Sequence, residues 1–110
     1  MDTLYGNLST EQIEKYKTKL HKKLFWLLLY KDPNTKDKYV NVNFKKTFTS
    51  FMWMLSGLND LILSPSWMVE LMSILQTAYT EGLKEDYDWY KYRSLIFDAQ
   101  SLVDNLGKDV

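Results

Sequence analysis

Seven consecutive apolar residues at positions 24–30 constrain the fold of this chain more than any other feature. They end a segment in which apolar residues recur every three or four positions, as on one side of a helix. A helix that is apolar all round must be covered on every side, by the rest of the fold or by a partner. Since a membrane span needs roughly 20 apolar residues, we predict a buried helix and no membrane span.

Capping residues and prolines set the limits of four predicted helices. Ser9 and Gln12 form a capping box before the first helix, and Pro33 disfavours helical geometry in the residue before it. We expect Asn43 to cap the second helix and Pro65 to be the first residue of the third. Gly82 is expected to end the third helix in a left-handed conformation. The predicted helices span about residues 10–31, 44–63, 65–81 and 87–106.

The second helix has the most regular pattern in the chain. Its apolar residues follow alternate steps of four and three, typical of the seam of an antiparallel bundle. They are Phe44, Phe48, Phe51, Leu55, Leu58 and Ile62. With mostly short loops and 110 residues, the sequence predicts an all-α protein, an up-and-down four-helix bundle in one domain. We read the segment before Phe44 as an extended lead-in, and expect no sheet.

Few side chains are suited to catalysis or metal binding. The absence of cysteine excludes disulfides and thiolate ligands, and no signal peptide is evident, so we expect a cytoplasmic protein. His21 is the single histidine, and no carboxylate lies three or four residues from it. A triad would need both other members from elsewhere in the fold. We therefore predict a protein that is not an enzyme and has no cofactor or metal.

One dense acidic cluster lies between the third and fourth helices, at Glu81, Glu85, Asp86 and Asp88. Its spacing does not fit a calcium-binding loop. We expect Asp86 or Asp88 to cap the fourth helix, where a negative charge is favourable, and the other two side chains to be solvated.

The formal charge is zero overall but unevenly distributed. Residues 1–50 contain ten lysines and five acidic residues, whereas residues 51–110 contain four basic and nine acidic residues. We expect the basic first helix to lie beside acidic helices. The alternative is a basic face for nucleic acid, an acidic partner or anionic lipid. With Arg93 as the only arginine, sequence-specific DNA binding is disfavoured. The basic face comprises Lys15, Lys19, Lys22 and Lys23.

Several apolar or aromatic residues lie away from the predicted core stripes. Either their helices pack on two sides, or these residues form a contact surface, because aromatic residues and arginine are the usual anchors of interfaces. If their helices are adjacent, Trp53, Trp26 and Phe97 would share one continuous surface. The candidates are Phe25, Trp26 and Leu29 on the first helix, Trp53 and Gly57 on the second, and Tyr90, Arg93 and Phe97 on the fourth.

These features favour a non-enzymatic helical bundle that acts by protein–protein interaction. The partner is either another protein or a second copy in a homodimer. Immunity, antitoxin and inhibitor proteins are comparable only by analogy of fold. Two alternatives stay open, a nucleic-acid-associated accessory protein using the basic first helix and a small-ligand binder with a pocket between helices.

Overall fold

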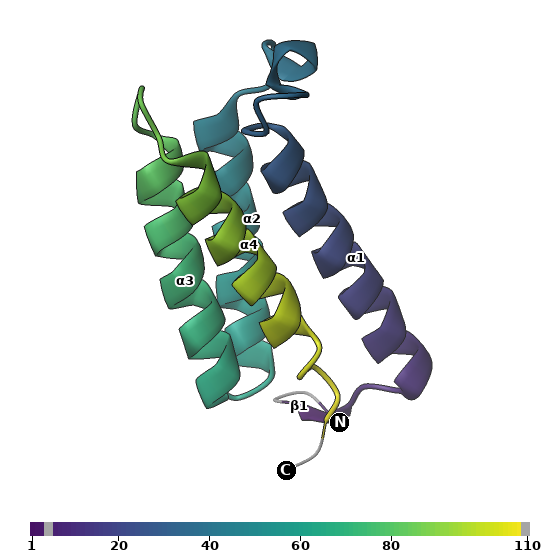
Figure 1. Cartoon of the computed structure of the whole chain (residues 1–110). Helices are drawn as coiled ribbons and strands as arrows, with labels where there is room; N and C mark the ends of the chain where they lie inside the picture. Colours follow the sequence, from purple (N-terminus) through teal and green to yellow (C-terminus); the bar gives the residue numbers. More distant parts are fainter. Residues whose placement is uncertain (4–5, 109–110) are drawn as a thin grey trace.

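A computed structural model of the chain describes residues 1–3 and 6–108. It contains four helices that run alternately up and down a body of 44 × 22 × 20 Å, with the first residues and the end of the last helix at the same end of the bundle (Figure 1). The predicted all-α four-helix bundle is confirmed. The helices are α1 (Thr10–Leu29), α2 (Phe44–Leu61), α3 (Ser66–Gly82) and α4 (Trp89–Val103).

Three helices begin at the capping residues predicted from the sequence. The Ser9 hydroxyl accepts a hydrogen bond from the Gln12 backbone N–H at 3.1 Å, and the Gln12 side chain accepts one from the Ser9 N–H at 2.8 Å. Asn43 and Asp88 each accept a hydrogen bond from the backbone N–H three residues later. These side chains satisfy N–H groups that have no partner within the helix.

The predicted ends of α2 and α3 need correction. Leu63 and Ser64 adopt left-handed conformations, with φ of 68° and 53°, so α2 ends before them and Pro65 is the N-cap of α3 rather than its first residue. Gly82 is still helical, and the C-cap is Leu83 in the right-handed region. Gly82 is needed for packing instead, because a Cβ there would lie 2.7 Å from Cζ of Phe44.

Two short elements were not predicted. Strands β1 (Asp2–Thr3) and β2 (Gly6–Asn7) pair in a two-stranded antiparallel sheet near the N-terminus, so the expectation of no sheet was wrong. A 3-10 helix, η1 (Lys36–Tyr39), replaces part of the expected extended lead-in to α2. Tyr39 in η1 packs edge-on against the rings of Trp26 and Tyr30. Elements of two to four residues are too short to show a hydrophobic period.

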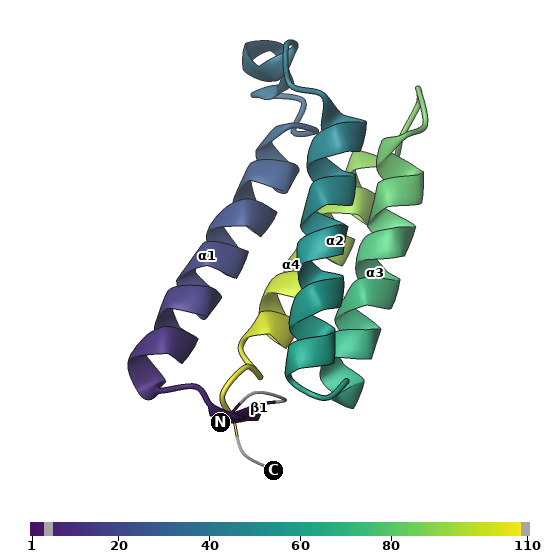
Figure 2. The ribbon, with the colours of Figure 1, turned by 180° about the vertical axis from the view of Figure 1, so that it is seen from behind.

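The core follows the predicted seams, but the four helices are not equally close. Five of the six seam residues of α2 are buried, and only Phe44 is half-buried. Helix α4 packs most extensively on α3 and then on α1, whereas α1 and α2 have little contact. Seen from the α1–α2 side, α4 is visible between these two helices (Figure 2). The bundle is therefore least closed between α1 and α2.

The apolar run at the end of α1 is covered on one side only. Leu24, Leu27 and Leu28 are buried, but Phe25 is 51% exposed and Trp26 is 40% exposed. The other helices of the chain therefore leave part of this run open to a partner. Within residues 1–3 and 6–108, no helix combines the length and apolarity needed to cross a membrane.

Candidate functional site

A long concave surface in the described part of the molecule lies between α1 and α2. We call it the α1–α2 groove. Two hollows between the helices make it up, with volumes of about 450 and 360 Å³, and a third of about 260 Å³, lined by α1 alone, extends it along that helix. The first and second share Met54, and the first and third share Tyr16 and Lys19. Its lining residues are Gln12, Lys15, Tyr16, Lys19, Leu20, Lys23, Trp26, Leu27 and Tyr30 from the α1 side, and Lys46, Thr47, Ser50, Phe51, Met54, Gly57, Leu58, Asp60 and Leu61 from α2.

The groove is long, and its floor is apolar. It follows α1 from Gln12 to Tyr30, which is about 27 Å at 1.5 Å per residue. Leu20, Leu27 and Leu58 are buried side chains that reach its floor. All three hollows are open to solvent along their length rather than enclosed. This shape fits an elongated amphipathic segment better than a compact small molecule.

Gly57 lies within α2 on the wall of the groove. A Cβ at this position would meet nothing within 4 Å, so packing inside the monomer does not require a glycine. Glycine in the interior of a helix costs about 1 kcal/mol relative to alanine. Gly82, by contrast, has a packing reason, since the Phe44 ring occupies the space of its missing side chain. The missing side chain at Gly57 leaves room for a second molecule to approach α2 closely.

The edges of the groove are mainly basic. Lys15, Lys19 and Lys23 follow one another at four-residue steps along α1, and Lys46 lies on the α2 edge. All four are exposed, and Asp60 is the single acidic residue of the lining. Three of the four predicted basic-face residues therefore border the groove, whereas Lys22 is absent from its lining.

The lysines of α1 are not paired with acidic helices. Lys15 forms its ion pair, at 3.3 Å, with Glu11 of the same helix. In the portion of the chain that the structure describes, no lysine of α1 forms an ion pair with another helix. The expected compensation between the basic helix and the acidic helices therefore involves no ion pair of the α1 lysines within the described residues. Helix α4 packs on the side of α1 that carries His21. His21 is two residues from both Lys19 and Lys23, so it lies on nearly the opposite side of the helix.

The predicted contact residues lie on three sides of the bundle. Trp26 and Gly57 line the α1–α2 groove. Trp53 is 80% exposed but borders a separate hollow of about 230 Å³, which includes Met72 of α3. Trp53 is thus absent from the lining of the α1–α2 groove, although it lies one helical turn from Ser50 and Gly57, which belong to that lining.

The remaining candidates lie along the outer α1–α4 seam. His21 contacts Gln100 and Asp104, and the antiparallel register then places Phe25 level with Phe97 and Leu29 level with Arg93. The Arg93 guanidinium lies 4.6 Å from the centroid of the Phe97 ring. Tyr90, which lies one turn before Arg93 in α4, is 78% exposed.

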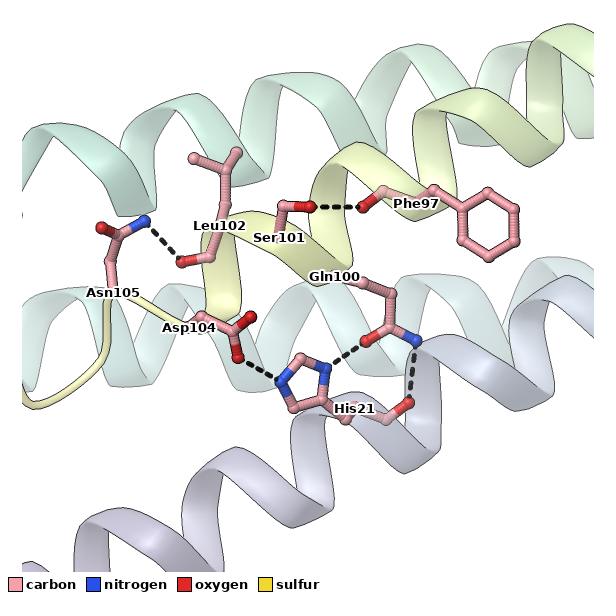
Figure 3. Close-up of polar contacts among 7 residues, drawn as sticks. All are labelled: His21, Phe97, Gln100, Ser101, Leu102, Asp104 and Asn105. Carbon is pink, nitrogen blue, oxygen red and sulfur yellow. Dashed lines mark hydrogen bonds and ion pairs between the residues drawn. The ribbon is translucent and has the colours of Figure 1, made fainter.

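His21 connects α1 to α4 (Figure 3). Its Nε2 lies 2.9 Å from the Asp104 carboxylate, its Nδ1 contacts the Gln100 side-chain oxygen, and the Gln100 amide donates to the His21 carbonyl at 3.1 Å. The carboxylate partner that α1 lacks is therefore supplied by α4. Because both ring nitrogens face oxygen acceptors, neither faces a hydroxyl nucleophile, and the arrangement serves to join two helices.

Two tyrosine hydroxyls fix α1 on α4 more firmly. The buried Tyr92 donates to the Leu27 carbonyl at 2.6 Å, and Tyr87 donates to the Lys31 carbonyl at 2.5 Å. Burial raises the pKa of Tyr92 far above its usual range, and Tyr87 adds to the shift. Burial, and then Asp32, raise the pKa of Tyr87. The Tyr92 bond joins the end of α1 to α4, and the Tyr87 bond joins the residues that follow α1 to those that precede α4.

The acidic cluster contains one residue that sequence reasoning misjudged. Glu81 was expected to be solvated, yet its side chain is only 5% exposed. Its carboxylate accepts from the Asp88 backbone N–H at 3.0 Å and pairs with Lys84 and Lys91, each at 3.3 Å. The Asp88 hydrogen bond, then the two lysines, lower the pKa of Glu81 despite the opposing effect of burial. Glu81 therefore ties the end of α3 to the start of α4.

No arrangement of the described side chains resembles a metal centre, since no group of three or more His, Asp or Glu residues could hold an ion. Comparison with protein-family models, with curated proteins and with solved structures finds no match. The interpretation of the α1–α2 groove therefore depends on its own geometry and charge.

Proposed function

We propose that this protein is a non-enzymatic binding module that takes a helical segment of another protein into the α1–α2 groove. The observation that carries the proposal is Gly57, an unfilled position in the wall of a groove about 27 Å long. An amphipathic helix of about 18 residues has that length. Its apolar side would cover the half-buried side chains of Tyr16, Met54 and Leu61, as in other helix-in-groove complexes.

The surroundings of the groove support the same function. Trp26 is 40% exposed at one end, where Tyr30 and Tyr39 pack against its ring and limit its movement. A rigid, partly exposed tryptophan is a frequent anchor of protein interfaces. The apolar run of α1 would then be covered from both sides, by α4 within the chain and by the partner outside it.

The experiment is a selection of 18-residue helical peptides from a displayed library against the wild-type protein. Binding is then measured with Gly57→Phe, which fills the groove, and with Ser73→Phe, which adds the same side chain to an exposed position of α3. We expect Gly57→Phe to weaken binding by about thirtyfold or more, the loss typical of an interface hot spot, and Ser73→Phe to leave it unchanged.

A second pair of variants separates the groove from the other exposed tryptophan. Trp26→Ala should weaken the selected peptides by at least tenfold, whereas Trp53→Ala should have little effect, because Trp53 lies outside the groove. Peptides that bind Gly57→Phe as tightly as the wild type would overturn the proposal. A selection that yields no binder would do the same.

A further inference from the structure

We infer that the segment bound in the α1–α2 groove is an acidic amphipathic helix, with carboxylates at four-residue intervals beside its apolar stripe. This inference rests on the proposed function and specifies the chemistry of the partner. It follows from where the lysines lie, from the lack of compensating acids, and from the regular spacing of the row on α1.

The lysines of the row are regularly spaced along α1. Lys15, Lys19 and Lys23 are separated by four residues each, so their Cα atoms lie about 6 Å apart along the axis of α1. A helix lying along the groove repeats its own side chains at the same interval. Glutamates at every fourth position of such a helix would each meet one lysine of the row. Lys46 on the α2 edge provides a fourth positive charge across the groove.

The lysines of the row are largely unpaired with acidic residues in the described part of the free protein. Like charges four residues apart destabilise a helix, and in the described residues only Lys15 of this row has an acidic partner, Glu11. The Lys15–Glu11 pair is itself highly exposed, with side chains 76% and 80% accessible, so solvent screens it. An acidic helix would neutralise a row that the fold leaves uncompensated.

The apolar surface of the groove favours a protein partner over nucleic acid. A duplex offers phosphates but no apolar surface to cover the half-buried Met54 and Leu61 and the exposed ring of Trp26. An acidic amphipathic helix offers both the carboxylates and the apolar stripe. Arg93, the one side chain suited to bidentate phosphate binding, lies at the α1–α4 seam and outside the groove.

The test uses the full chain and three labelled 18-residue peptides that share one leucine stripe on an alanine background. They carry glutamate, glutamine or lysine at three positions spaced by four beside the stripe. We expect the glutamate peptide to bind about tenfold more tightly than the glutamine peptide at low salt. The lysine peptide should bind most weakly. The difference should shrink as the salt concentration rises, because the lysines are exposed.

Charge reversal provides the matched control. The double variant Lys19→Glu with Lys23→Glu should reverse the order and favour the lysine peptide. Lys22→Glu changes the net charge of the same helix outside the groove and should preserve the order. Circular dichroism of each variant verifies that the helices are retained.

The outcomes separate the two proposals. Equal binding of the glutamate and glutamine peptides, lost with Gly57→Phe, would retain the groove as a helix-binding site and overturn the acidic partner. Failure of all three peptides and of the library selection would overturn both. Displacement of the glutamate peptide by duplex DNA or RNA at equal charge, or a wild-type dimer that Gly57→Phe dissociates, would also overturn the acidic helix as the occupant.

Discussion

The two sides of α1 show how differently one helix can be bound within the same small bundle. Towards α4, its carbonyl groups accept hydrogen bonds from Tyr92 and Gln100, and His21 reaches Asp104. Towards α2, the described residues form no such bonds, and the surface is a groove edged with lysines. Directional bonds fix α1 on α4, whereas only limited apolar contact connects it to α2. A helix fixed on one side can leave its other side free for a partner.

The largest expected effect distinguishes the packed side from the open one. Tyr92→Ala should destabilise the protein by about 3–5 kcal/mol, the range for truncating a large buried aromatic residue. Met54→Ala, which shortens a half-buried side chain in the groove wall, should cost clearly less. Chemical denaturation measures both. Similar losses would mean that the α1–α2 side is as well packed as the α1–α4 side.

Removing single hydroxyls tests the directional bonds alone. Tyr92→Phe leaves the Leu27 carbonyl without its side-chain donor and should cost about 1–3 kcal/mol. Tyr16→Phe is the matched change in the groove, because the structure gives the Tyr16 hydroxyl no hydrogen bond within the described residues. It should change the unfolding free energy by less than about 0.5 kcal/mol. Urea titrations of both variants and of the wild type measure the unfolding free energies. Equal losses in the two variants would contradict the prediction.

Alkaline pH should weaken the α1–α4 side selectively. Because burial raises the pKa of Tyr92 in the folded protein, its stabilising contribution is complete below the unfolded pKa of about 10 and is lost as the pH rises above it. One such group lowers the unfolding free energy by about 1.4 kcal/mol per pH unit. In unfolding curves this slope should develop above about pH 10, and Tyr92→Phe should reduce it. A slope unchanged in the variant would contradict the assignment.

The smallest effect compares the two helical glycines. Gly57→Ala should stabilise the protein by about 0.5–1 kcal/mol, because alanine favours a helix and its Cβ has open space. Gly82→Ala should instead destabilise it by about 1 kcal/mol, because its Cβ would press on the Phe44 ring, which is packed against Phe48 and Tyr79. Thermal unfolding of both variants and of the wild type measures these two changes in stability. An increase in stability for both variants would mean that the Phe44 ring can shift to make room for the Cβ atom at position 82.

The sequence by itself determined the local structure and most of the core. The caps at Ser9, Asn43 and Asp88 and the α2 seam follow from interactions within a few residues, which the sequence displays directly. It also revealed the row of lysines and the unusual apolar residues of α1. The function remains a proposal, because no pattern in the sequence names a partner.

The tertiary structure decided which of these features lie together. His21 meets Asp104 across 83 positions, and Tyr92 meets the Leu27 carbonyl across 65, so the tilt of α1 towards α4 cannot be inferred from either helix alone. The burial of Glu81 likewise depends on how helices pack. Periodicity shows which face of a helix is buried, but only side chains distant in sequence decide which neighbour covers it and where a groove stays open.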